Sequence, residues 1–532
     1  MTAPGHDAGI APADRASDPI GDITVGDMLA EQLLLAPDRV FCRYADQALT
    51  VQELADNVRR VANVLSDLGI KRGDRVATIL GNGFEQVYVM LACLTSGYVW
   101  VPVNHNQRGK ALDHLLANAD PRLVVIDPLL NTPAADPARL PRHLRLLAAT
   151  PHAAVPGPSL VERAAEAASG APEHQALADD VVCISYTSGT TGKPKGVMLT
   201  NRMFRACAVG VRHTISPEGG DVVYVWEPLH HNGGNQMVIL GLLAPVTLAL
   251  GSRFSARRFW TEVAESGATH IHYLGGVLQI LLKQQPTSAE VSHRVRVLWG
   301  GGCPRELWFE AERRFGLTPR EVYGMTETAS VTTANIDGPA GSVGKSLPHF
   351  EVAIGRRDGS VNPAPGELGE ILVRERRPGI LTPGYFRDPD ATERLRVPGS
   401  PWLRTGDSGL LDEDGNLFFF GRLNDSVRRR GENVSAWEVE SVISDHPLVA
   451  ECAMIGVPAE IGEQDIKIFV RPVDGATLDP LALIDWCAAR MASYQVPRYV
   501  SIVDSFEKTP TQRIKKEVLS HLSVETWDRE AS

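Results

Sequence analysis

The most informative stretch of this sequence reads Tyr186-Thr187-Ser188-Gly189-Thr190-Thr191-Gly192-Lys193-Pro194-Lys195-Gly196-Val197. It follows an apolar run, Val181 to Ile184, and leads into a second one, Val197 to Leu199, and both runs are typical of buried strands. Glycine lets backbone N–H groups close around an anion, and lysine adds positive charge. The stretch therefore predicts a phosphate-binding loop between two strands, although neither the usual P-loop pattern nor the dinucleotide pattern fits it.

Length and composition indicate an ordinary globular protein with more than one domain. The chain has 532 residues, too many for one core, and 43% of them are apolar and 22% charged. Its net charge of −11 argues against a nucleic-acid or anionic-membrane partner. It has neither a signal peptide nor an apolar run of about 18 residues, and the seven cysteines form no C-x-x-C pair. These features favour a cytoplasmic enzyme.

The order of predicted helices and strands divides the chain into unequal parts. Helices and strands alternate before and after the loop, which is typical of a parallel α/β sheet. From about 342 to 420 short strands and Asp-Gly turns predict a β-barrel-like subdomain. We therefore predict an α/β fold with a disordered N-terminus (1–22), a large N-terminal domain of stacked α/β subdomains (23–421) and a small, mobile α+β C-terminal domain (422–532).

Local signals predict where several helices begin. Thr50 and Glu53 form a capping box, and Thr200 or Asn201 is a good N-cap for a helix over about 202–211. A further helix is predicted over 235–243, and Asp479-Pro480 predicts an N-cap with proline at the first helical position.

Five further motifs occur after the loop. They are Pro228-Leu229-His230-His231-Asn232-Gly233, Trp299-Gly300-Gly301-Gly302-Cys303-Pro304, Tyr323-Gly324-Met325-Thr326-Glu327-Thr328, Arg404-Thr405-Gly406-Asp407, and Gly421-Arg422 with Arg430-Gly431-Glu432-Asn433. Together with the loop they resemble the adenylate-forming superfamily of acyl-CoA and aryl-CoA synthetases, peptide-synthetase adenylation domains and beetle luciferases. The resemblance covers roughly residues 25–515 and looks strongest toward carnitine/crotonobetaine-type and aryl or medium-chain CoA ligases.

The resemblance implies a role for each motif. The phosphates of ATP would be held by Thr187, Ser188, Gly189, Thr190, Thr191 and Lys193. The nucleoside would be bound by Gly301, Gly302, Cys303, Tyr323, Gly324, Met325, Asp407 and Arg422. Thr326 would donate to the α-phosphate, Glu327 would bind Mg²⁺, and His231 would gate the carboxylate pocket. These residue types suit the chemistry, because joining a carboxylate to a phosphate requires that accumulating negative charge be neutralised.

Plainer structural explanations compete with some of these roles. Asp407 could be a turn residue, and His230 could be confused with its neighbour His231. For His270 and His272 a structural role is favoured, because two histidines at i and i+2 without a third ligand do not make a metal site. The run Arg428 to Arg430 is interpreted as a partly solvated face.

Two positions depart from the family pattern. The expected hinge residue is Asn424, where the family usually has Asp or Lys, and Asn still tolerates unusual backbone angles. The late catalytic lysine is replaced by Arg513, which keeps the charge but is a bulkier, planar fork. Lys515 or Lys516 could compensate for the missing lysine. The change is thus either a tolerated variation or a sign of altered adenylation.

The leading functional hypothesis is an ATP-dependent acid–CoA ligase that uses ATP, Mg²⁺, CoA and a small carboxylate or related oxyanion. One alternative is an adenylating enzyme with another acceptor or acid, such as an amide-forming, carrier-loading or ATP- and nitrite-dependent diazotising enzyme. Another is a nucleotide-binding protein without catalysis. The substrate pocket is expected at Asn232, Gly234, Asn235, Gly276 and Trp299, which favours a small polar or aromatic acid. A homodimer is left open.

Overall fold

The computed structural model describes residues 20–107, 109–187, 194–356, 361, 364–423, 426–429, 432–459, 464–491, 493, 495–509 and 513–531. Several predicted site residues lie outside this part of the chain: Ser188, Gly189, Thr190, Thr191, Lys193 and the hinge residue Asn424. The predicted N-terminal segment lies outside it as far as residue 19. Packing contacts begin at Ile20, which is 1% exposed, and Arg202 forms an ion pair with Asp22. Packing thus starts three residues before the predicted boundary.

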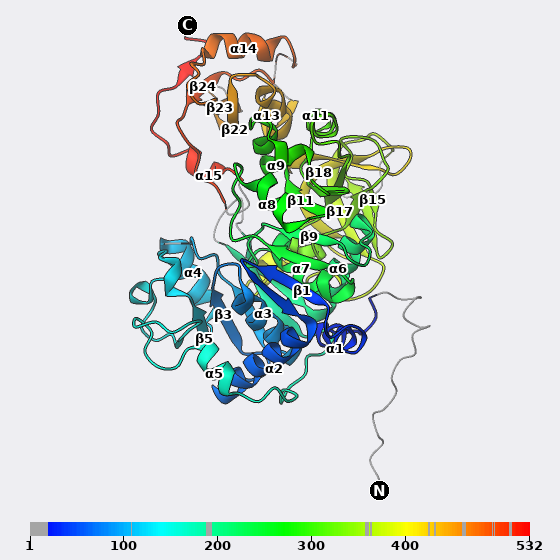
Figure 1. Ribbon diagram of the computed structural model, residues 1–532. Helices are drawn as coiled ribbons and strands as arrows, with labels where there is room; N and C mark the ends of the chain where they lie inside the picture. Colours follow the sequence, from blue (N-terminus) through cyan, green and yellow to red (C-terminus); the bar gives the residue numbers. More distant parts are fainter. Residues whose placement is uncertain are drawn as a thin grey trace.

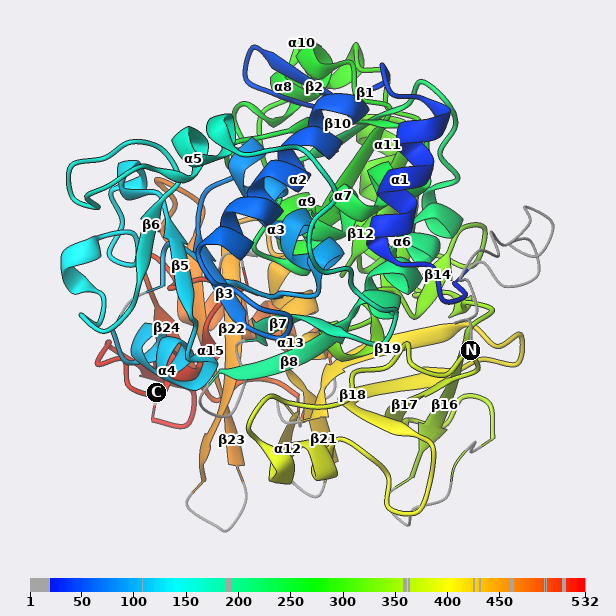
Figure 2. The ribbon, with the colours of Figure 1, turned by 90° about the horizontal axis from the view of Figure 1, so that it is seen from below.

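Two large sheets dominate the described chain (Figures 1 and 2). The first has the order β15-β14-β13-β12-β11-β9-β10-β1-β2 and the second the order β6-β5-β3-β4-β7-β8. The first contains β1 (Val40–Tyr44), β2 (Gln47–Thr50), β9 (Val222–Val225), β10 (Thr247–Leu250), β11 (His270–Leu274), β12 (Val297–Gly301), β13 (Pro319–Tyr323), β14 (Thr333–Asn335) and β15 (Lys345–Ser346). The second contains β3 (Arg75–Ile79), β4 (Val99–Pro102), β5 (Leu123–Ile126), β6 (Leu146–Ala148), β7 (Val181–Thr187) and β8 (Lys195–Thr200).

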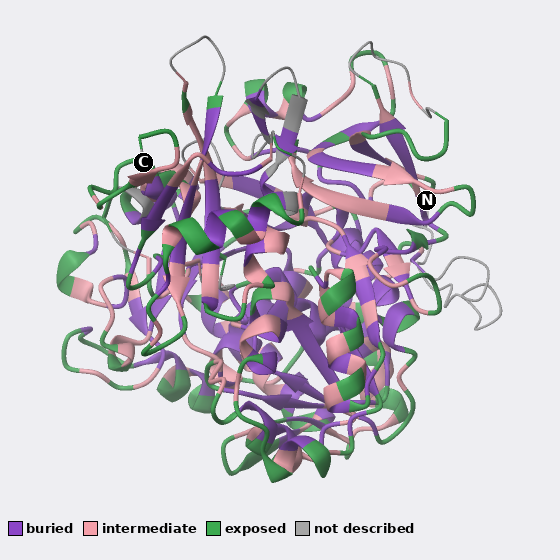
Figure 3. Cartoon of the chain, turned by 90° about the horizontal axis from the view of Figure 1, so that it is seen from above, coloured by how far each residue is buried: buried purple, intermediate pink, exposed green. Residues whose placement is uncertain are grey.

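Helices cover both faces of each sheet, and the core clusters identify the layers. Figure 3 shows buried strands inside the molecule and exposed residues mainly on outer helices and loops. The layer between the sheets contains α1 (Val25–Leu35), α2 (Val51–Asp67), α3 (Phe84–Ser96), α6 (Asn201–Ile215) and α7 (Asn232–Leu243), with α5 (Leu160–Glu166) packed on α2. The outer face of the first sheet carries α8 (Phe259–Ser266), α9 (Gly275–Leu282), α10 (Ser288–Val291) and α11 (Arg305–Phe315). The outer face of the second carries α4 (Gly109–Ala119) and two short 3₁₀ turns, Pro128–Leu130 and Pro137–Arg139. Parallel strands such as β5 are therefore buried on both faces.

Local sequence signals set several helix ends. Thr50 and Glu53 form the predicted capping box of α2, and Thr200 caps α6 by accepting from the N–H of Met203. Asp479 caps the helix that starts at Pro480, also as predicted. The start of α7 differs from the prediction, since this helix begins at Asn232 and not near 235. His231 takes the cap position, and its Nδ1 accepts from the N–H of Gly233.

The last third of the chain changes from parallel to antiparallel pairing. β16 (Phe350–Gly355), β17 (Gly369–Glu375), β18 (Leu403–Leu411) and β19 (Leu417–Arg422) form an antiparallel sheet, with α12 (Pro389–Arg394) beside it. The remaining elements are β20 (Ser426–Arg429), β21 (Glu432–Ser435), α13 (Ala436–Ser444), β22 (Val449–Pro458), β23 (Gln464–Pro472), α14 (Pro480–Ala488), β24 (Tyr499–Ile502), α15 (Lys516–Leu519) and β25 (Trp527–Asp528). These elements build separate cores, so the predicted fold class is confirmed. The domain limit near 422 stays a proposal.

Two charged residues stabilise the small C-terminal part. Lys283 joins it to the large part, and Arg429 is buried within it. Lys283 on the large part donates from Nζ to the carbonyls of Val449 and Ala450 at 2.7 and 3.0 Å. Arg429 is 2% exposed and pairs with Asp465 at 3.1 Å. The interpretation of its tri-arginine run as a solvated face is therefore wrong for Arg429, because a buried guanidinium requires a carboxylate partner.

Two further findings concern the whole described chain. All seven cysteines are buried free thiols, as expected of small core residues. No helix in the described ranges has the length and apolarity that a bilayer crossing requires.

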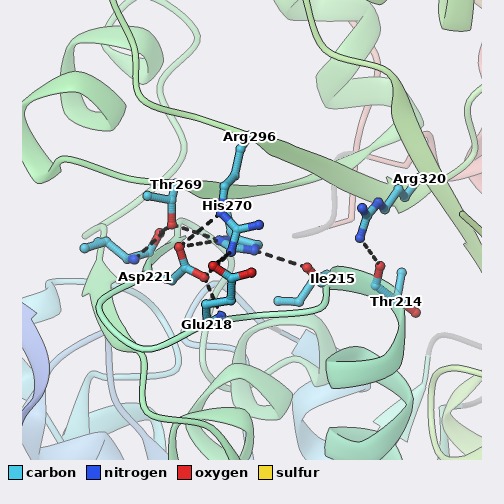
Figure 4. A network of polar contacts seen from close by, with 9 residues as sticks. Thr214, Ile215, Glu218, Asp221, Thr269, His270, Arg296 and Arg320 are labelled. Carbon is cyan, nitrogen blue, oxygen red and sulfur yellow. Dashed lines mark hydrogen bonds and ion pairs between the residues drawn. The ribbon is translucent and has the colours of Figure 1, made fainter.

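His270, the first residue of β11, contacts the end of α6 and the segment before β9 (Figure 4). The ring is fully buried, its Nε2 donates to the carbonyl of Ile215 at 3.2 Å, and the Thr269 hydroxyl lies 2.8 Å from Nδ1. Burial lowers the pKa of His270 from 6.5 to about 4; Arg296 and Arg320 add to the lowering and Asp221 opposes it. The ring is thus neutral in the folded protein, and the described residues place no metal-binding cluster around it.

This lowered pKa makes the fold acid-sensitive. The unfolded chain binds a proton near pH 6.5 and the folded chain only near about 4, so stability is present above pH 6.5 and is lost as the pH falls. Between about pH 8 and about pH 5, His270 is expected to account for a loss of about 2 kcal/mol in the free energy of unfolding. In urea titrations over this pH range, the free energy of unfolding of His270→Gln should fall less than that of the wild type, and the difference should equal this amount. The exposed His213→Gln variant should behave like the wild type.

Candidate active site

The candidate site lies where four neighbouring strands of the first sheet end. β13, β12, β11 and β9 are adjacent and parallel, so their carboxyl ends meet at one edge. Directly after them come Gly324, Gly302, Gly275 and the segment from Trp226 to His231. In open α/β sheets this edge is where ligands bind. Motifs that are separate in the sequence are therefore brought to one place.

A three-residue contact joins three of the predicted nucleotide motifs. Tyr323 at the end of β13 donates from its hydroxyl to Oδ2 of Asp407 at 2.8 Å. Arg422 faces Asp407 across the β18–β19 pair, with Nε 2.9 Å from Oδ1. The Tyr323 ring also packs on Phe419, with centroids 5.8 Å apart. Asp407 is 3% exposed and belongs to this contact, so it is more than a turn residue.

The glycine run after β12 is shaped by close backbone contact. A Cβ on Gly275 would lie 2.0 Å from the carbonyl oxygen of Gly302, and Gly302 itself has a φ of +91°. Only glycine permits this approach and this backbone conformation. The N–H groups of Gly302 and Cys303 both donate to Oε1 of the buried Glu321, and the Cys303 side chain is 4% exposed. These two N–H groups are therefore already occupied, so a nucleotide base would contact the carbonyl groups and Cα atoms of the run.

Glu321 is a residue that the sequence interpretation missed. Burial raises its pKa to about 8, and its hydrogen bonds to Tyr273, Cys303 and Gly302 only partly oppose this. Tyr273 donates to its other carboxyl oxygen. Glu321 thus supports the shape of the glycine run by accepting from its backbone N–H groups.

Glu327 lies in the short turn Thr326–Thr328 and is 5% exposed. Its Oε1 accepts from the hydroxyl of Tyr385 at 2.8 Å. Burial raises the pKa of Glu327, and the Tyr385 hydrogen bond lowers it in part. Tyr385 also joins the described ends of the phosphate-loop hairpin: it forms a bridge with Val197, and Lys195 Nζ lies 4.9 Å from its ring centroid. The loop strands and Glu327 therefore meet at Tyr385, which the sequence interpretation also missed.

The Tyr385 contact makes a testable prediction. In Tyr385→Phe, Glu327 loses the donor that orients its carboxylate, and such supporting contacts typically contribute ~10- to 100-fold in metal affinity or activity. We expect a rate loss of this size together with a higher Mg²⁺ concentration for half-maximal activity. A loss of structure alone would lower the rate without shifting the Mg²⁺ dependence. Tyr98→Phe, another buried tyrosine, is the matched control and should change neither.

The acid-binding side is built around the start of α7. His231 caps this helix and its side chain reaches solvent. Nearby protein atoms still shield the ring enough that desolvation lowers its pKa; Glu227 opposes this, and Arg513 and His272 add to it. His230 next to it is instead buried and packs edge to face on His105, with centroids 5.6 Å apart. Of the two histidines, His231 is therefore the one that a ligand from solvent can reach.

The predicted pocket residues are mostly buried near His231. Asn232 and Asn235 are 9% and 2% exposed, and Asn232 Oδ1 lies 3.5 Å from the hydroxyl of Ser185. A Cβ on Gly234 would lie 2.4 Å from the carbonyl oxygen of Pro228, so Gly234 serves the turn before the helix. Gly276, at the start of α9, is exposed. Trp299 is fully buried beside His272, with ring centroids 4.4 Å apart.

Arg513 reaches this site from the small C-terminal part. Its charge lowers the pKa of His231, which places the two residues within electrostatic range. Lys515 binds Glu507 at 2.6 Å and Lys516 binds Glu440 at 2.8 Å, both within the small part. In this structure both lysines are thus paired within the small part, and their replacing the family lysine stays a prediction. Thr187, the described start of the phosphate loop, pairs with Lys195 in the β7–β8 hairpin.

The chain is similar to known families and to solved structures. Two family models match it: AMP-binding enzyme, over residues 29–386, and AMP-binding enzyme C-terminal domain, over residues 438–513. A medium/long-chain-fatty-acid–CoA ligase of Mycobacterium tuberculosis is 31% identical over 94% of this chain and 85% of its own length. ATP-bound MatB from Rhodopseudomonas palustris has a TM-score of 0.82 at 27% identity, covering 94% of this chain and 99% of that one. The O-succinylbenzoate coenzyme A synthetase of Bacillus subtilis in complex with ATP and a magnesium ion has a TM-score of 0.79 at 26% identity, covering 93% and 99%.

Proposed function

This chain belongs to the AMP-binding enzyme family, and from that premise we propose that it is an ATP-dependent acid–CoA ligase. It is an AMP-forming acid–thiol ligase with two half-reactions. A carboxylate oxygen attacks the α-phosphorus of ATP, the bond to pyrophosphate breaks, and an acyl-adenylate forms. The thiol of CoA then attacks the acyl carbon, and AMP leaves. The Tyr323–Asp407–Arg422 contact beside the buried Glu327 is the observation that carries the proposal.

The nucleoside would be held on one side of the sheet edge. The Asp407 carboxylate is positioned by Tyr323 and Arg422, and a carboxylate accepts from both hydroxyls of a ribose. Tyr323 and the glycine run offer flat surfaces on which an adenine can stack. Thr187 and the hairpin strands present the phosphate loop from the opposite sheet. ATP would thus lie at the carboxyl edge of the first sheet, beside the β7–β8 hairpin of the second, with its α-phosphate directed toward Thr326.

The residues at Glu327 fit a magnesium ion. The buried carboxylate has a raised pKa, and a bound cation would offset the cost of its negative charge. The described residues hold no cluster of three or more metal ligands, which suits an ion that takes one carboxylate and completes its shell with water and phosphate oxygens. When bound, Mg²⁺ would neutralise phosphate charge. Tyr385 would keep the carboxylate turned toward the phosphates.

His231 and Arg513 would act on the acid. The lowered pKa keeps His231 neutral near pH 7, so it can swing or pack beside a carboxylate without holding it as an ion pair. The Arg513 guanidinium would bring positive charge to the two anions that must meet. After adenylation the small domain would turn about Asn424 and withdraw Arg513, which opens the site to CoA. A carnitine/crotonobetaine-like branch remains our finer proposal for the acid.

The test is to separate the two half-reactions. ATP–pyrophosphate exchange is measured with a panel of carboxylic acids, and AMP release is then measured with and without CoA. Acid-dependent exchange followed by CoA-dependent AMP release supports the proposal. AMP release that does not depend on CoA would indicate another acceptor, and nucleotide binding without any turnover would contradict the proposal.

A further inference from the structure

A buried carboxylate lies beside the gate histidine and has no place in the reaction described so far. Glu227 is 3% exposed and lies between β9 and α7. A Cβ on Gly233 would lie 1.9 Å from its Oε2, so the carboxylate presses directly on the first turn of α7, two residues after His231. The backbone carbonyl of Glu227 accepts from Asn82 at 3.1 Å. Its position is therefore fixed by both backbone and packing.

The two oxygens of this carboxylate have different surroundings. Oε2 lies 3.0 Å from Nδ1 of His272, on the neighbouring strand β11. Oε1 is equally buried and has no hydrogen-bond partner within the described ranges. Burial would raise the pKa of Glu227, but His272 and His231 together lower it below its usual value. The group is thus a buried anion with one oxygen that is left to accept a hydrogen bond.

The surroundings of the Glu227–His272 pair suit an organic ligand. The His272 ring lies between Trp299, with centroids 4.4 Å apart, and Trp226, with centroids 6.4 Å apart. In the described structure the indole N–H of Trp299 and the amide nitrogen of Asn235 are buried without a hydrogen-bond partner. Native proteins rarely leave such groups unpaired, so each of them indicates a missing partner. Asn235 lies one turn of α7 after His231, and Trp299 directly precedes the glycine run; the acid is proposed to bind between these two segments.

We propose that Glu227, held by His272, selects acids that carry a second group able to donate a hydrogen bond, a hydroxyl or an amino group, and rejects acids with a second carboxylate. This inference rests on the proposed function. A donor on the substrate would fill the open Oε1, and a hydroxyl could also accept from Trp299. A second carboxylate would meet a buried negative charge at close range, which is strongly unfavourable. Glu227 is thus a specificity residue, and His272 is its positioning partner.

The test measures binding, so it does not depend on turnover. Non-hydrolysable acyl-sulfamoyl adenosines are prepared on two scaffolds, a para-substituted benzoyl and an unbranched pentanoyl, each ending in methyl, hydroxyl, amino or carboxylate. Dissociation constants are measured by calorimetry for the wild type and for Glu227→Gln. Glu290→Gln is the matched control, since Glu290 is 2% exposed and paired with Arg314 at 2.7 Å, away from the site.

On the scaffold that binds more tightly, the wild type should prefer the hydroxyl or amino compound over the carboxylate by at least ~100-fold. Glu227→Gln should reduce this ratio to below about tenfold, mainly by improving the carboxylate compound, and Glu290→Gln should leave it unchanged. The amino compound should lose more affinity than the hydroxyl compound, because only the former is charged. Wild-type protein that binds the carboxylate compound as well as the others would overturn the inference. If these compounds bind as expected but no acid supports exchange, the proposed function fails and the selectivity stands.

Discussion

Replacing Glu327 by glutamine is expected to lower acid-dependent AMP release by ~10²- to 10³-fold. The amide has the same shape and can still accept from Tyr385, so the turn Thr326–Thr328 should keep its structure. What is lost is the negative charge that would bind a cation between this turn and the phosphates. Initial rates measured at several Mg²⁺ concentrations should show that added Mg²⁺ does not restore the activity.

The stability of the same variant gives a second readout. Glu327 is buried and its pKa is raised, so exchanging the acid for a neutral amide removes a cost of burial. The melting temperature of Glu327→Gln should therefore equal or exceed that of the wild type. Glu351→Gln, which removes a partly exposed carboxylate on β16, is the activity control. A variant that melts normally and keeps full activity would show that Glu327 has no part in the reaction.

Replacing Arg513 by alanine is expected to affect one half-reaction only. Its charge reaches His231 from the small domain, and removing it should lower ATP–pyrophosphate exchange by at least ~100-fold. Thioester formation from a supplied acyl-adenylate and CoA should stay within about threefold of the wild type, since the proposed domain turn would withdraw Arg513 in that step. Equal losses in both half-reactions would mean that Arg513 serves folding or domain contact instead.

Arg513→Lys decides between the two explanations of this unusual arginine. Lysine keeps the charge but lacks the planar fork, so we expect exchange to remain within about tenfold of the wild type. A rise above the wild-type rate would mark the arginine as a degraded form of the family lysine. A collapse would mean that the guanidinium has its own hydrogen bonds to the reacting groups. Lys515→Ala is the control, because Lys515 is engaged by Glu507.

Sequence reasoning worked best where all the residues that determine a feature lie within one short segment. The capping box at Thr50 and the N-cap at Thr200 need only neighbouring residues, and both are confirmed. The family resemblance likewise rests on short motifs, and the family itself is confirmed by the matching models. The roles of individual site residues remain predictions, including those in the loop between Thr187 and Pro194.

The residues that sequence reasoning missed have no local signal. Tyr385 touches Glu327 from 58 positions away, and Glu321 supports the glycine run from the following strand. Glu227 directly precedes the motif that contains His231 and could have been noticed there, but its partner His272 is on another strand. Likewise, nothing in the sequence indicated the ion pairs of Lys515 and Lys516, the two candidates to replace the family lysine. Each has a partner that only the folded small domain supplies.

The sequence by itself determined the α/β class, the ends of several helices and the identity of the family, because backbone propensity, capping and short motifs act between near neighbours. Only the tertiary structure decided which carboxylates are buried, which of them carry a partner, and that the charge of Arg513 acts on His231. Burial and electrostatic coupling depend on distance in space, and the parallel strands bring together side chains that the chain itself keeps far apart.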